Sequence, residues 1–486
     1  MKMEISMNKA VRFVRRMIVN AVTDAGLFVF VSFMMAFFSS MDPFLLTREE
    51  LSLLRQYVFI PWGAALCIYR MQRANERNLK TRAEVGALFV LWLWLVVPFA
   101  LRFGFPARAV GGWHSYGVMF FAIYALVSEE ERKRREAAFD HVTLLFAVLG
   151  WILGVTLLYC AVTAKSFMTE FGSFSYGVHQ DMHLTSGHYY NTTALIGLYT
   201  ALMCLAGMSR SKCARSRLLY AVPAVMMSVV TILTQSRTAR YALLTALALG
   251  TYGVASCLLK GRRLLVRQFC ALALGTVVLV GGYFGADYLT EKALVHFATH
   301  ETKTNMLTLI APAVAEEAEP EMQAEEVDVD DLKRGFGDAT FTGRTKIWKN
   351  AIAIWKGTPR YMFIGVGAGN SGMLLAKNFW AFEQIGGVEA HNACLQFAVD
   401  YGIIALALIF AFSGLVFGPA LRVFCRDDWR SGYGVMAMLV AAVMLVGLME
   451  SDPLAGLTLS STLLFFALAM LAARGRELKQ AENEKE

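Results

Sequence analysis

Long apolar stretches recur along almost the whole of this chain, from Met17 to Leu471. Each is long enough to cross a hydrocarbon core of about 30 Å, for which roughly 20 helical residues suffice. The composition agrees, because 56% of the 486 residues are hydrophobic and only 17% are charged, which is unlike an ordinary soluble protein. The sequence therefore predicts an all-α fold, a polytopic bundle of transmembrane helices.

Most of the 46 Lys and Arg residues fall in short segments that are separated by pairs of apolar stretches. Cytoplasmic loops of membrane proteins are enriched in Lys and Arg, so we assign these segments to the cytoplasm. The segments are 1–16, 70–82, 132–135, 210–217, 260–267, 422–430 and 474–486. This assignment predicts about 12 transmembrane helices with both termini in the cytoplasm, and it explains the net charge of +8 without nucleic-acid binding.

The expected spans divide the chain into four parts. Residues 1–285 form transmembrane helices 1–9, residues 286–390 a large extracytoplasmic segment, residues 391–473 transmembrane helices 10–12, and residues 474–486 a cytoplasmic tail. The expected spans are 17–38, 54–70, 84–102, 110–127, 140–163, 190–207, 218–235, 238–258, 268–287, 392–416, 432–450 and 454–473.

The extracytoplasmic segment between the ninth and tenth spans has two distinct stretches. Residues 316–331 are acidic and poor in large apolar side chains, which indicates a disordered insert. Between residues 345 and 357, apolar residues recur at helical spacing opposite lysines. This pattern predicts an amphipathic helix that lies in the outer interface of the membrane.

Arg237 stands in the short outer turn before the expected span 238–258, Arg240 lies in the first turn of that span, and Arg344 opens the amphipathic helix. Arg237 and Arg240 could extend to lipid phosphates, or their guanidinium groups could bind a substrate diphosphate through several fixed donors. Arg344 could be a solvated charge or a third anion-binding group. Lys346, on the same helix, is a further candidate for substrate binding.

A glycine cluster that includes Gly365 and Gly367 follows the amphipathic helix. Glycines let backbone amides approach an anion closely, so both residues are candidates for substrate binding. The spacing matches neither the dinucleotide-binding nor the triphosphate-binding glycine signature.

His391 and Asn392 stand at the mouth of the tenth expected span. The imidazole could simply lie at the interface or cap the helix, or it could take a proton from a sugar hydroxyl, because an imidazole has an unperturbed pKa of about 6.5. Asn392 could orient the ring or a substrate. Glu450 and Asp452, at the outer end of the eleventh span, could pair with the arginines or tune His391.

Two stretches could suggest a metal site, and neither pattern favours one. His179, His183 and His188 lie irregularly in an outer loop, and residues 328–331 place a DxD-like run inside the acidic tract. We expect no metal and no cofactor.

Taken in chain order, these residues form a recognisable pattern. It comprises Ser236-Arg237-Thr238 between two spans, Gly343-Arg344-Thr345 with Trp348 in a long external segment, Gly365-Val366-Gly367, and His391-Asn392 followed by Gly402. This arrangement resembles the O-antigen ligase and O-antigen polymerase superfamily over roughly residues 190–471.

The resemblance implies a metal-independent, integral-membrane glycosyltransferase of the GT-C type in the bacterial cytoplasmic (inner) membrane. Such an enzyme takes a glycan from an undecaprenyl-diphosphate carrier and transfers it on the outer face to an acceptor, which is the lipid A core in ligases. Carried over by position, Arg237 and Arg344 would bind the diphosphate, and His391 would act as the base on the acceptor hydroxyl.

Two alternatives remain open from the sequence. A polymerase of the same superfamily, for O-antigen, capsule or teichuronic-acid-type polysaccharides, would use another lipid-linked repeat unit as acceptor. A transporter or flippase would only move a lipid-linked sugar. The number of expected spans is typical of transporters, whereas the absence of internal repeats and of charged residues near mid-span argues against one.

Overall fold

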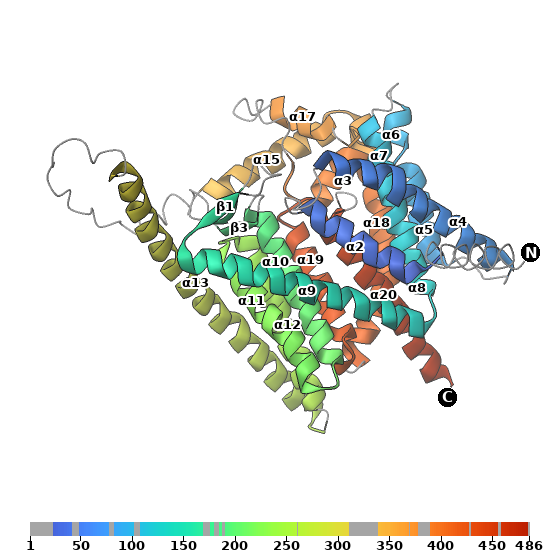
Figure 1. Ribbon diagram of the computed structural model, residues 1–486. Coiled ribbons are helices and arrows are strands. Elements are labelled where there is room, and N and C mark those ends of the chain that lie inside the picture. The colour runs from blue at the N-terminus through green and yellow to red at the C-terminus, as the bar shows by residue number, and fades with distance from the viewer. Residues whose placement is uncertain are drawn as a thin grey trace, which may run out of the picture.

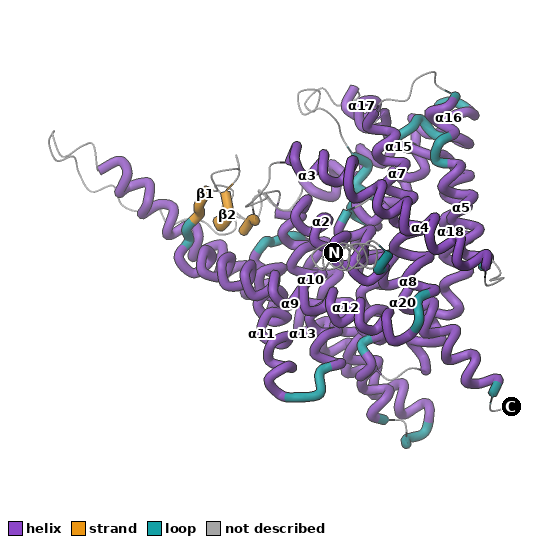
Figure 2. The backbone as a smooth tube through the Cα atoms, turned by 45° about the vertical axis from the view of Figure 1, so that its right-hand side comes forward, coloured by secondary structure: helices purple, strands orange, loops and turns teal. Residues whose placement is uncertain are grey.

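The computed structural model describes residues 23–40, 48–76, 82–101, 107–168, 175–178, 184–186, 190–259, 261–310, 339–368, 370–377, 389–426, 429–454 and 458–484. Its N-terminal half consists of α2 (Ala25–Ser40), α3 (Arg48–Leu54), α4 (Ile60–Glu76), α5 (Ala83–Trp94), α6 (Val97–Ala100), α7 (Ala107–Gly117), α8 (Leu126–Glu129), α9 (Arg132–Thr163), α10 (Tyr190–Arg210), α11 (Ala214–Leu233) and α12 (Arg237–Leu258). The C-terminal half consists of α13 (Leu264–Ile310), α15 (Ala339–Lys356), α16 (Pro359–Ile364), α17 (Asn370–Lys377), α18 (Ala393–Arg426), α19 (Tyr433–Gly447) and α20 (Leu459–Asn483). Figures 1 and 2 show these helices packed into one bundle.

The helical membrane architecture is confirmed, but the count of about twelve spans is not. Within the described residues, eight helices are long and apolar enough to cross a membrane. Two further apolar helices, α2 and α19, are shorter. The expected spans 54–70 and 110–127 instead run through π-helical segments at Arg55–Phe59 and Val118–Ala125.

Two helices extend beyond the expected boundaries of their domains. The helix expected to end at residue 287 continues to Ile310 as part of α13, because residues 286–310 contain neither Gly nor Pro to stop it. Likewise, α20 continues to Asn483 through the expected tail, with an ion pair between Arg474 and Glu477 one turn apart. The acidic stretch 316–331 lies outside the described residues.

The expected outer loop 164–188 contains a small sheet that the all-α prediction missed. Strands β1 (Ser166–Met168), β2 (Ser175–Val178) and β3 (Leu184–Ser186) form an antiparallel sheet in the order β1-β2-β3. In its register, Phe167 pairs with Tyr176, and Tyr176 pairs with Ser186. Strands of three or four residues are too short for alternation of side chains to reveal them.

The core of the bundle lies around α10 and α20, which are the most buried of the candidate spans, whereas α13 is peripheral. Aromatic side chains from distant helices meet edge to face there, as Phe33 of α2 does with Phe146 of α9 and Phe466 of α20. Such pairs add about 0.5–1.5 kcal/mol each beyond the burial of their area. The core thus fixes α19 and α18, which pack against α20.

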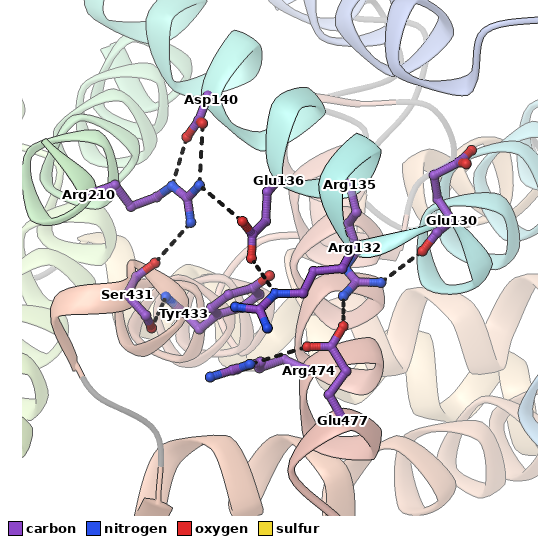
Figure 3. A network of polar contacts seen from close by, with 10 residues as sticks. All are labelled: Glu130, Arg132, Arg135, Glu136, Asp140, Arg210, Ser431, Tyr433, Arg474 and Glu477. Atoms are coloured by element: carbon purple, nitrogen blue, oxygen red, sulfur yellow. Dashed lines mark hydrogen bonds and ion pairs between the residues drawn. The ribbon is translucent and has the colours of Figure 1, made fainter. Parts of the chain in front are cut away.

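The basic segments gather at one end of α19, as Figure 3 shows. Arg210 lies 2.7 Å from Asp140 and donates to the carbonyl of Ser431, just before α19. Arg135, whose side chain is 4% exposed, pairs with Glu477 of α20. Three of the seven basic segments therefore converge on one end of the bundle. The C-terminal end of α19 points to the opposite end, where α15 and α17 lie (Figure 1).

Candidate active site

Glu450, just beyond the C-terminal end of α19, bridges two of the residues predicted from the sequence. Its Oε1 lies 2.9 Å from Nη2 of Arg344 on α15. Its Oε2 lies 3.2 Å from Nδ1 of His391, which precedes α18. The carboxylate is only 12% exposed, whereas the His391 side chain is 38% exposed. Three segments that are distant in sequence thus meet at one carboxylate.

The bridge dictates how the His391 ring can work. An ionised carboxylate only accepts hydrogen bonds, so in the neutral ring the proton stands on Nδ1 and points to Glu450. The other ring nitrogen, Nε2, then carries the lone pair that can take a proton. When it does, Glu450 faces the new positive charge, as the orienting carboxylate of a nucleophile–His–acid triad does. Arg344 supplies a second positive group to the same carboxylate.

The backbone at His391 has an uncommon conformation that its neighbours hold in place. His391 has a φ of 47°, and the other described non-glycine residues with positive φ are Ala164 and Gln235. Residues in this region cost free energy and persist where the surroundings fix them. Asn392 is one such support: its Oδ1 accepts from the Leu395 amide at 2.9 Å, and its Nδ2 donates to the Leu448 carbonyl at 3.0 Å. Asn392 thus caps α18, and its expected contact with the ring or a substrate stays a prediction.

The arginines of α12 lie at the same end of the bundle. The C-terminal part of α12 contacts the N-terminal part of α19, since Gly250 lies against Met438 and Gly253 lies against Trp429. The two helices are therefore antiparallel, and Arg237, exposed at the first position of α12, stands at the Glu450 end. The structure thus places Arg237 at the Glu450 end of the bundle, and Glu450 joins Arg344 and His391 as their shared partner.

Arg240 has partners within the protein. Its side chain is 9% exposed and its Nη1 lies 3.6 Å from Oδ1 of Asp287 on α13. Its guanidinium carbon also lies 5.5 Å from the ring centre of Tyr241 and 5.7 Å from that of Tyr283. These contacts hold α12 to α13 and leave the expected diphosphate contact of Arg240 without structural support.

Gly365 and Gly367 serve the packing of α18. Their amides donate to the carbonyls of Tyr361 and Asp400 at 2.9 Å each, and neither is left for an anion. A Cβ on Gly365, where φ is 88°, would lie 2.4 Å from the Asp400 carbonyl oxygen. Reciprocally, Gly402 breaks α18 with a φ of 80°, and its Cβ would meet the Phe363 carbonyl oxygen at 2.1 Å. The glycines permit two backbones to cross, and their predicted anion contact stays a prediction.

The amphipathic helix differs from its prediction in position and packing. It starts at Ala339, so Arg344 lies in its second turn rather than its first. Its apolar residues Ile347 and Ala351 are buried against Val366 and Val399, and therefore pack on protein. Trp348 Nε1 donates to the carbonyl of Ala390 at 2.9 Å. This docking brings Arg344 to Glu450.

Several predicted residues lie outside the described parts of the chain. They are the side chain of Lys346, the DxD-like run 328–331, and His179, His183 and His188. Elsewhere, within the described residues, no group of three or more His, Cys, Asp or Glu side chains could hold a metal ion.

Comparison with known protein families decides the class. Residues 222–410 match the O-antigen ligase family. This region of the chain is similar to O-antigen ligases. No curated protein matches the chain. The match confirms the resemblance to the O-antigen ligase superfamily and establishes a multi-pass membrane protein of ligase or polymerase type. The matched region contains Arg237, Arg344 and His391, and it ends before Glu450.

Asp452 is a second carboxyl group close to Glu450 and His391. It opens the 3₁₀ turn Asp452–Leu454, two residues after Glu450. Burial, reinforced by the nearby carboxylates of Glu389 and Glu450, raises the pKa of Asp452 to about 7, and His391 opposes the rise. Between a pH of about 4 and that pKa, the native protein holds a proton that the unfolded chain has released. Stability therefore falls as the pH rises through this window.

We expect the Asp452→Asn variant to be more stable than the parent protein at pH 8, by about 2 °C or more in the unfolding midpoint, because the neutral amide carries no desolvation penalty. The difference should shrink at pH 5, where native Asp452 is already protonated. Thermal unfolding in detergent at both pH values measures it. An equal difference at pH 5 and pH 8 would show that Asp452 does not titrate as described.

Proposed function

We propose that this protein is an inverting glycosyltransferase that moves a glycan from an undecaprenyl-diphosphate carrier to an acceptor hydroxyl, the lipid A core or its equivalent, at the outer face of the cytoplasmic membrane. The observation that carries the proposal is the bridge from Glu450 to both Arg344 and His391. The proposal combines a proton acceptor and a cation at one place, which is what transfer from a diphosphate to a hydroxyl requires. The similarity to O-antigen ligases supports the same reaction.

In the proposed reaction, the acceptor oxygen attacks the anomeric carbon as the bond from that carbon to the diphosphate oxygen breaks. His391 takes the proton of the acceptor hydroxyl on Nε2, and Glu450 stabilises the resulting imidazolium. The negative charge that develops on the diphosphate is met by Arg344 and Arg237. A guanidinium has five N–H donors, so Arg344 can keep its bond to Glu450 while it donates to a phosphate oxygen.

A transfer assay with the purified protein tests the proposal. A lipid-linked glycan is mixed with lipid A core, and the products are separated by mass. We expect the glycan to appear on the acceptor, with one undecaprenyl diphosphate released for each glycan transferred. A ladder of longer glycans that stay on the carrier would assign the protein to the polymerases. Absence of any new glycosidic bond, with transport of donor in vesicles, would replace the enzyme by a transporter.

A further inference from the structure

Gln396, one turn into α18, has hydrogen-bond partners for both polar atoms of its side chain, and one of these partners is the peptide that precedes His391. Its Oε1 accepts from the Ala390 amide at 2.7 Å. Its Nε2 donates to Oγ of Ser371 on α17 at 2.8 Å and to Oδ2 of Asp400 at 2.9 Å. The Ala390 amide can only donate and an ionised carboxylate can only accept, so these two partners fix which end of the Gln396 amide points where.

Asp400 is held at its backbone carbonyl and at Oδ2 of its side chain. It lies one turn after Gln396 in α18 and is 8% exposed. Its carbonyl accepts from the Gly367 amide at 2.9 Å, at the crossing where Gly402 interrupts α18. Ser371, 2% exposed, ties the same group to α17. Hydrogen bonds among buried polar groups restrict their movement.

The peptide that this group holds is the one that sets the His391 backbone. The Ala390 amide is fixed by Gln396, and the Ala390 carbonyl is fixed by Trp348 of α15. The next residue is His391, with its left-handed backbone and its ring on Glu450. A shift of Ala390 would therefore move the ring relative to Glu450 and to the acceptor, and errors of about 1 Å in such geometry can cost about 100-fold in rate.

We propose that Gln396 and Asp400 form a positioning pair that holds the 390–391 peptide, and through it sets the orientation of His391. Neither side chain contacts the His391 ring in the described structure, so the pair acts on the base and not on the substrate. The inference rests on the proposed function, since it needs His391 to be the base. It predicts that the polarity of the pair matters more than the identity of either residue.

An exchange of acid and amide tests the pair without changing its size or charge. Gln396→Glu alone leaves two carboxyl groups 2.9 Å apart in the native geometry, and we expect kcat to fall about tenfold or more because the bond between them is lost. In the double variant Gln396→Glu with Asp400→Asn, the amide of residue 400 donates to the carboxylate of residue 396, which still accepts from Ala390. We expect this variant to recover most of the lost kcat.

Separate effects on kcat and on KM distinguish a positioning role from a general loss of structure. Gln396→Glu should lower kcat while KM for the donor stays within about twofold, because the diphosphate-binding groups are untouched. Tyr252→Phe, which removes the contact with Gln268 between α12 and α13 near the opposite end, is the control for a lost buried contact. It should leave kcat unchanged.

The outcomes separate this inference from the proposed function. If His391→Ala is inactive but Gln396→Glu keeps the parent kcat, or if the double variant is no better than the single one while all proteins remain monodisperse in detergent, the positioning role is wrong and the proposed function stands. If His391→Ala is active, the proposed function fails first. Recovery in the double variant supports the positioning role.

Discussion

Replacing His391 with alanine is expected to lower the rate of glycan transfer by about 10²–10⁴-fold, the range that a positioned general base contributes. The variant keeps Arg344 on Glu450, so donor binding should survive. Initial rates with the purified protein, at saturating donor and acceptor, measure the loss. The pH dependence that belongs to the base should disappear from the residual rate.

The matched control for this prediction is His296→Ala. His296 is a histidine of α13 whose Nε2 contacts the Val162 carbonyl at 2.9 Å, and it does not contact Glu450 in the described structure. We expect this variant to transfer glycan at the parent rate. Near-parental activity in His391→Ala would remove the base from the reaction scheme.

Replacing Arg344 with alanine is expected to cost about 10²–10³-fold in kcat, the effect of removing one group that meets transition-state charge. The loss should include a weaker donor interaction, since Arg344 is proposed to bind the diphosphate before and during transfer. Arg344→Lys should recover only part of the activity, because an ammonium keeps the charge but loses the planar set of donors. Transfer rates as a function of donor concentration measure both effects.

Arg360→Ala is the control for Arg344. Arg360 belongs to α16, and its Nη2 donates to the Leu101 carbonyl at 2.6 Å. The control should change the rate little. An Arg344→Ala variant that matches it, with the protein intact in detergent, would contradict the assignment of Arg344 to the diphosphate.

The sequence predicts the helical membrane architecture and singles out Arg344 and His391, which the structure joins at Glu450, because these signals depend on local patterns. Apolar length marks the spans, and Lys and Arg mark one end of the bundle, where Arg210 and Arg135 indeed gather. The motifs around Arg344 and His391 mark the site. Each of these signals is read within a few residues, so no knowledge of packing is needed.

The sequence names Glu450 and Asp452 as candidates to pair with the arginines or to tune His391, but it does not choose between them, because that choice depends on tertiary contacts. Arg344 and Glu450 are 106 positions apart, and several acidic residues at the same end are equally compatible with the pattern. The docking of α15 on protein was missed for a similar reason: an apolar helical face packs equally well on lipid or on other helices. For the pair of Gln396 and Asp400, a local clue exists in the sequence, because residues four positions apart lie on one face of a helix.

The glycines indicate a close backbone approach, but the sequence does not show which group approaches them. Gly365 and Gly402 do mark a close backbone approach, and an added Cβ on either would collide with a carbonyl of the other segment. A glycine indicates that something comes near, whereas only the fold reveals what that is.

The shortness of α19 has a consequence for how a substrate reaches Glu450. Its 15 residues rise about 22 Å, whereas the hydrocarbon core of a bilayer is about 30 Å thick. If the end of the bundle that carries Arg135 and Arg210 lies at one headgroup layer, the Glu450 carboxylate lies several ångströms below the opposite headgroup layer. A membrane-borne pyrophosphate would then have to descend to it, or the surrounding lipid would have to become locally thinner.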